Sequence, residues 1–173
     1  MNEELKKRIL SSILLFPIVM FIIINGSTIF NLFLIICLSI TLYEWYIMSK
    51  KKKYCYLGII FLIFSFYTIH QIYNLNNDYL TFLFILFICI STDIGGYVFG
   101  KLFKGPKLTY ISPNKTYFGV IGGYILSFMF LTILFQFSSL FLNEIDYTIN
   151  TYIKIFLIST ISQLGDILIS YFK

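Results

Sequence analysis

Two aspartates lie inside long apolar stretches, and their positions indicate a shared cation site. Asp93 lies eight residues before Lys101, and Asp166 lies seven residues before Lys173. At a helical rise of about 1.5 Å per residue, both carboxylates lie roughly 10 to 12 Å from a lysine that would mark the same membrane face. Ionisable residues within a bilayer are costly and usually functional. We therefore expect the two carboxylates to lie at one depth and to bind a divalent cation.

Asp166 belongs to a polar stripe. Residues that recur every three or four positions share one face of a helix, and here they are Ser159, Ser162, Gln163, Asp166, Ser170 and Lys173. The serines fit hydrogen bonding between helices as well as they fit ligand binding. For Asp166, function is favoured, because Gly165 beside it admits a close ligand. Asp93 needs a metal ion or a lysine partner, since a lone buried carboxylate is costly.

A basic loop over residues 100–116 offers groups for binding phosphate. It contains Lys101, Lys104, Lys107 and the run Ser112-Pro113-Asn114-Lys115-Thr116. Pro113 favours a turn, while hydroxyl groups, helix N-terminal amides and Lys115 can contact a phosphate. The spacing Gly100-x-x-x-x-Gly105 is not a P-loop, because no lysine follows the second glycine directly and no strand precedes it.

The composition excludes a soluble globular protein. Of the 173 residues, 58% are hydrophobic and 12% are charged, and the mean hydropathy is +0.85, whereas soluble domains carry about 25% charged residues. Six apolar stretches can cross a bilayer core of about 30 Å, at residues 9–24, 29–48, 56–73, 79–99, 117–142 and 152–172. We predict one all-α domain over residues 1–173, a polytopic membrane bundle of about six transmembrane helices.

The distribution of cations predicts the orientation of this bundle. With a cytoplasmic N-terminus, 12 of the 13 lysines and arginines lie on the cytoplasmic side, and only Lys154 falls near the outer face. This pattern obeys the positive-inside rule. The net charge of +5 therefore reflects membrane topology, and we expect no nucleic-acid partner. The three cysteines lack the paired spacing of a zinc site or a disulfide framework.

Two other ionisable residues have plainer interpretations. Glu44 lies six residues, or less than two helical turns, before the lysines at 50–53, with which it is expected to pair. His70 lies near the outer end of the third apolar stretch and is expected to be an interfacial or hydrogen-bonded histidine.

Taken together, the motifs resemble the bacterial phosphatidate cytidylyltransferase family, the CDP-diacylglycerol synthases. The resemblance covers Asp93 with the glycines after it, the run from Ser112 to Thr116, and Gly165-Asp166 with Ser170 and Lys173. It implies a nucleotidyltransferase of phospholipid biosynthesis that converts CTP and phosphatidate into CDP-diacylglycerol and pyrophosphate. It also implies Mg²⁺ as cofactor, a multi-pass protein of the bacterial inner membrane, and a homodimer.

The resemblance assigns roles to individual residues. Asp166 would be a metal ligand and catalytic residue, with Asp93 and Lys115 in the same catalytic cavity. Substrate and its phosphates would be bound by Ser112, Asn114, Thr116, Ser170 and Lys173. The family signature continues beyond Lys173, so we expect a C-terminally truncated chain with little activity by itself. Two alternatives stay open, a CTP-dependent polyprenol or phytol kinase-like lipid kinase and a small non-enzymatic transporter.

Overall fold

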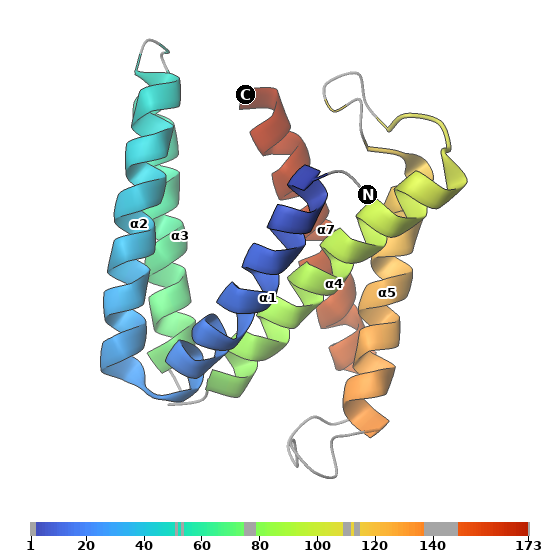
Figure 1. The fold of residues 1–173 in the computed structure, drawn as a ribbon, viewed down its shortest axis with the longest axis horizontal. Helices are drawn as coiled ribbons and strands as arrows, with labels where there is room; N and C mark the ends of the chain where they lie inside the picture. Colours follow the sequence, from blue (N-terminus) through green and yellow to red (C-terminus); the bar gives the residue numbers. More distant parts are fainter. Residues whose placement is uncertain are drawn as a thin grey trace. The chain divides into compact units, whose positions relative to one another are not determined.

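The computed structural model of the chain consists of helices joined by irregular connections. It describes residues 3–50, 52, 54–74, 79–108, 112, 115–136 and 149–172, and the side chains in these ranges except at 3–9, 12, 27, 134–136 and 172. The helices are α1 (Glu3–Ile24), α2 (Ser27–Ser49), α3 (Cys55–Asn74), α4 (Tyr79–Phe103), α5 (Tyr117–Gln136) and α7 (Ile149–Phe172) (Figure 1). The predicted all-α membrane helix bundle is confirmed.

Within the described residues, four helices are long and apolar enough to cross a membrane. These segments are Thr28–Ser49, Cys55–Asn74, Tyr79–Phe103 and Ile149–Tyr171. Two shorter apolar segments, Ile13–Ile24 and Tyr117–Ile133, lie in the first and fifth predicted spans. The predicted end of the fifth span, at residue 142, lies outside the described residues. The cytoplasmic N-terminus and the single-domain organisation stay predictions.

The chain divides into two compact units, of which the first is Met1–Phe82. In this unit α2 and α3 form a hairpin of adjacent antiparallel helices (Figure 1). At the turn of the hairpin, the indole N–H of Trp45 donates to the carbonyl oxygen of Cys55 (3.0 Å). At the far end of α3, the Tyr73 hydroxyl donates to the carbonyl oxygen of Ile23 (2.8 Å). The two hydrogen bonds tie α1, α2 and α3 together.

The second unit, Leu83–Lys173, comprises most of α4 together with α5 and α7. One residue from each helix builds its apolar core, namely Ile88, Leu131 and Ile155, which are at most 2% exposed. Many other apolar side chains of the unit are exposed, as expected where lipid is the solvent. The described residues that the sequence assigns to the site all lie in this unit, so its three helices must position them.

Glycines allow α4 and α5 to cross at close range. A Cβ atom at Gly95 would collide with the backbone carbonyl of Gly122, and one at Gly119 would lie 2.8 Å from the carbonyl oxygen of Gly96. Small residues at such crossings let backbones approach closely in membranes. Gly96 and Gly100, four residues apart on α4, both face Gly119 across this crossing and therefore act in helix packing.

This crossing predicts different outcomes at two glycines. Gly95→Ala is expected to lower the free energy of unfolding by about 1–3 kcal/mol, because the added methyl group meets backbone that has no room to move. Gly165→Ala is the matched control, since nothing lies within 4 Å of a Cβ atom there. Thermal unfolding of the purified variants in detergent measures both. Equal melting temperatures in the two variants would show that the close crossing does not limit stability.

Candidate active site

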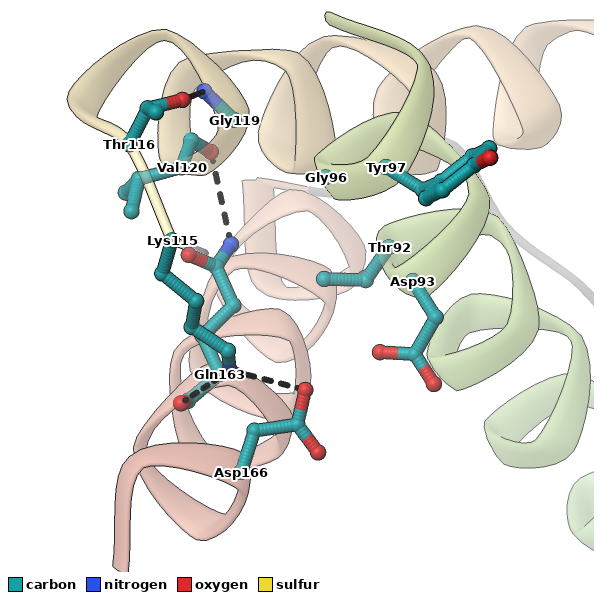
Figure 2. Close-up of a pocket in the computed structure, with 10 residues that line it drawn as sticks. All are labelled: Thr92, Asp93, Gly96, Tyr97, Lys115, Thr116, Gly119, Val120, Gln163 and Asp166. Atoms are coloured by element: carbon teal, nitrogen blue, oxygen red, sulfur yellow. Dashed lines mark hydrogen bonds and ion pairs between the residues drawn. The ribbon is translucent and has the colours of Figure 1, made fainter. Parts of the chain in front are cut away.

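One pocket in the second unit gathers groups from α4, α5, the loop before α5, and α7 (Figure 2). It is lined by Thr92, Asp93, Gly96, Tyr97, Lys115, Thr116, Gly119, Val120, Gln163 and Asp166. Its volume is about 220 Å³, below the roughly 300–1,000 Å³ of sites for drug-sized ligands. The pocket is therefore too small to enclose a whole drug-sized ligand.

The charged groups in this pocket are two carboxylates and one ammonium group. The Nζ atom of Lys115 lies 2.8 Å from Oδ2 of Asp166 and 3.5 Å from the carbonyl oxygen of Gln163. The Lys115 side chain is 27% exposed and that of Asp166 is 51% exposed. The Asp93 carboxylate reaches toward the same space from α4 (Figure 2). The structure thus brings the two aspartates together, as their matched depths predict.

The backbone around Lys115 is fixed on both sides. Lys107 and Thr116 form an isolated antiparallel bridge, and the N–H of Leu108 donates to the carbonyl oxygen of Lys115 (2.8 Å). Thr116 then caps α5, because its hydroxyl oxygen accepts the N–H of Gly119 (3.1 Å). Held between a bridge and a helix cap, Lys115 extends its side chain to α7.

A chain of hydrogen bonds joins the three helices beside the carboxylates. The side-chain amide of Gln163 donates to the carbonyl oxygen of Val120 (3.4 Å) and to the hydroxyl of Ser159 (3.5 Å). The hydroxyl oxygens of Ser159 and Thr92 lie 3.0 Å apart, and Thr92 also bonds to the carbonyl oxygen of Ile88 (2.8 Å). A hydroxyl carries one proton. When Thr92 donates its proton to the carbonyl oxygen of Ile88, the proton in the bond between Thr92 and Ser159 therefore comes from Ser159. Part of the polar stripe on α7 therefore serves helix packing. This packing fixes the positions of the two aspartates relative to each other.

The other residues assigned to substrate binding lie apart from the pocket lining or outside the described residues. Ser112 is buried, and its carbonyl oxygen accepts the N–H of Lys115 (3.1 Å). The Ser170 hydroxyl donates to the carbonyl oxygen of Asp166 (2.8 Å). Neither serine lines the pocket, and their binding roles stay predictions. Asn114 and Lys173 lie outside the described residues.

Outside the pocket, the structure bears on His70 and Glu44. The Nε2 atom of His70 lies 3.0 Å from the side-chain nitrogen of Asn74, which confirms a hydrogen-bonded histidine. Glu44 is exposed at the end of α2 that carries the lysine run.

Tyr97 is a lining residue whose role sequence reasoning missed. It lies four residues after Asp93 and therefore on the same face of α4. Its hydroxyl oxygen accepts a hydrogen bond from Nζ of Lys101 at 3.4 Å. The signal in the sequence was the four-residue spacing of Asp93, Tyr97 and Lys101, which places the three side chains on one face of a helix. This face connects the pocket to the basic loop.

The two carboxylates of the pocket are oxygen donors of the kind that hard divalent cations take. Mg²⁺ prefers oxygen and is usually bound through one or two carboxylates, with substrate phosphates and water as its other ligands. Asp93 and Asp166 supply two carboxylates to one space. Among the described residues, no group of three or more histidine, cysteine, aspartate or glutamate side chains is placed to hold a metal.

Comparison with known proteins places the chain in a family. A model described as the cytidylyltransferase family matches residues 54–173. The chain is 34% identical to phosphatidate cytidylyltransferase of Rickettsia bellii, with 99% of the chain and 76% of that protein covered. The same-named protein of Staphylococcus saprophyticus is 29% identical, with 80% and 54% covered. No solved structure matches the chain.

The matched region includes the whole pocket, since its lining residues lie between positions 92 and 166. The three helices and the loop that build the site are thus the part of the chain that the family shares. On the match over residues 54–173 and the identity to full-length relatives, the chain belongs to the cytidylyltransferase family.

Proposed function

We propose that the protein is a phosphatidate cytidylyltransferase that makes CDP-diacylglycerol and pyrophosphate from CTP and phosphatidate. The observation that carries the proposal is the charged pocket of Asp93, Lys115 and Asp166 on apolar helices, within the region matched by the family. Such a site allows a soluble triphosphate to meet a lipid phosphate. The protein would act in phospholipid synthesis in the inner membrane of a bacterium. Assembly as a homodimer stays a prediction.

The proposed reaction is a substitution at phosphorus. A phosphate oxygen of phosphatidate forms a bond to the α-phosphorus of CTP, and the bond from that phosphorus to the oxygen bridging to the β-phosphate breaks. Pyrophosphate leaves with this oxygen and its electron pair. Such transfers depend on positioning and on neutralising the charge of the phosphate oxygens. These are the tasks that we assign to the pocket residues.

Lys115 is suited to bind the phosphates of CTP. Its ammonium group has three donors, and its contacts here are the Asp166 carboxylate and the carbonyl oxygen of Gln163. Phosphate oxygens can replace both acceptors when the nucleotide arrives, because a triphosphate carries more negative charge than one carboxylate. Without substrate, the ion pair compensates the charge of Asp166.

Asp166 and Asp93 would hold the magnesium ion. When bound, such an ion neutralises charge on the triphosphate and orients it for in-line displacement. Thr116 has its hydroxyl proton available for a phosphate oxygen, since its oxygen accepts the N–H of Gly119.

The proposal is tested by product identity. Membranes that contain the protein, in the longest form that its coding sequence encodes, are supplied with CTP, phosphatidate and Mg²⁺, and lipids are identified by mass spectrometry. We expect CDP-diacylglycerol, and we expect EDTA to abolish it. A lipid kinase would phosphorylate an added polyprenol and release CDP, and a transporter would give neither product. CDP-diacylglycerol no higher than in membranes without the protein contradicts the proposal.

A further inference from the structure

We propose that Tyr97 and Lys101 of α4 form the subsite that binds the phosphate of the lipid substrate. This inference rests on the proposed function and assigns its two substrates to different cations. Lys115 serves the nucleotide from the side of α5 and α7, while phosphatidate docks along the exposed side of α4.

The first observation is a stripe along α4 that leads from the pocket to the basic loop. Asp93, Tyr97 and Lys101 follow one another at four-residue intervals, which span about 12 Å along the helix axis. The ammonium group of Lys101 lies 3.4 Å from the Tyr97 hydroxyl and 5.5 Å from the centre of its ring. Lys101 thus folds back along α4 toward the pocket. Tyr97 lines the pocket, and Lys101, which is not part of the lining, contacts Tyr97.

The second observation is the charge of the pocket. Its two carboxylates and one ammonium group give a formal charge of −1, and the ammonium group is engaged with Asp166. With Lys115 assigned to CTP and both carboxylates assigned to the magnesium ion, the pocket lining holds no further positive side chain for the lipid phosphate. Lys101 supplies one, and no carboxylate among the described residues forms an ion pair with Lys101. In Figure 2 the Tyr97 ring extends from α4 on the side away from Lys115, so the two cations act from different sides.

The third observation identifies the ligand as a lipid. An exposed apolar side chain directly follows each member of the stripe. These side chains are Ile94, Val98 and Leu102, which are 51%, 36% and 70% exposed. Exposed apolar faces of membrane helices contact acyl chains. A lipid whose chains lie on this face has its phosphate at the last turn of α4, where Lys101 lies. The chemistry is that of a membrane lipid with a terminal phosphate monoester.

Binding measurements test the subsite without requiring turnover. The purified protein in detergent micelles is titrated with phosphatidate, and bound lipid is counted by native mass spectrometry. Lys101→Gln is expected to weaken phosphatidate binding about tenfold, since it removes a charge-assisted hydrogen bond, whereas Lys101→Arg retains binding. Tyr97→Phe is expected to weaken it less. Lys52→Gln is the matched control, because Lys52 is an exposed lysine that also lies over a tyrosine ring, 6.0 Å from the centre of the Tyr54 ring, and belongs to the first unit.

Two binding results would overturn the inference. One is unchanged phosphatidate binding in Lys101→Gln, and the other is an equal loss in Lys52→Gln, which would indicate general surface charge. Soluble glycerol 3-phosphate separates a lipid site from a phosphate site. We expect it to compete weakly, and competition as strong as that of phosphatidate would show that the apolar face takes no part.

Kinetics then separate this inference from the proposed function. In Lys101→Gln the KM for phosphatidate is expected to rise about tenfold, with the KM for CTP unchanged. An active wild-type protein whose KM for phosphatidate is insensitive to this substitution contradicts the subsite alone. A wild-type protein that binds phosphatidate through Lys101 but makes no CDP-diacylglycerol contradicts the proposed function alone.

Discussion

Asp166→Asn is expected to lower the rate of CDP-diacylglycerol formation by about 10³-fold or more. Asparagine keeps the size of the side chain but removes the negative charge that would bind the cation and that pairs with Lys115 at 2.8 Å. The initial rate with CTP, phosphatidate and Mg²⁺ in membranes measures the effect. Because the Asp166 side chain is half exposed, the variant should fold, and its melting temperature checks this.

Thr160→Val provides a matched control on the same helix. The Thr160 hydroxyl lies 2.9 Å from the hydroxyl of Tyr124 and donates to the carbonyl oxygen of Phe156, outside the pocket. Valine has nearly the same shape, so the rate is expected to stay close to that of the wild type. Unchanged turnover in a folded Asp166→Asn protein would remove Asp166 from the metal-ligand role.

Lys115→Gln is expected to lower kcat/KM for CTP by about 10²-fold. The substitution removes the ammonium group that we assign to the triphosphate and leaves Asp166 without its cation. The loss should fall on CTP, with the KM for phosphatidate nearly unchanged, and steady-state kinetics with each substrate varied in turn measure this division.

Lys107→Gln is the matched control for Lys115→Gln. Lys107 lies opposite Thr116 in the same β-bridge but is exposed and does not line the pocket, so its loss should leave kcat/KM for CTP unchanged. The double variant Lys115→Gln with Asp166→Asn should lose less than the product of the single losses, because residues in contact act together. Multiplicative losses would show that the two residues act independently.

Much of the fold was open to prediction because lipid imposes a simple requirement. Every backbone polar group in the bilayer must be satisfied within the chain, so long apolar runs become helices. The basic clusters mark one interface, and the helical rise then gives the depths of Asp93 and Asp166. The helix boundaries were less accessible, as shown by α1, which begins at Glu3 instead of residue 9. A helix can continue beyond the apolar layer wherever charged side chains can reach water.

The individual partners within the site could not be predicted from spacing. The pairing of Lys115 with Asp166 depends on how the loop returns to form the bridge between Lys107 and Thr116. The bond between Thr92 and Ser159 depends on how α4 packs against α7, and the sequence alone indicates only that a polar face exists. Contacts within one helix, such as Lys101 with Tyr97, were accessible from the four-residue interval.

Transfer of labelled phosphorus tests the central claim most directly. The protein in membranes is given phosphatidate, Mg²⁺ and CTP labelled at either its α-phosphorus or its γ-phosphorus, and the label in the lipid fraction is counted. Cytidylyl transfer predicts that the α-label enters the lipid and that the γ-label leaves in pyrophosphate, with both outcomes lost in Asp166→Asn. Entry of the γ-label into lipid, with the α-label retained in soluble CDP, would contradict the account.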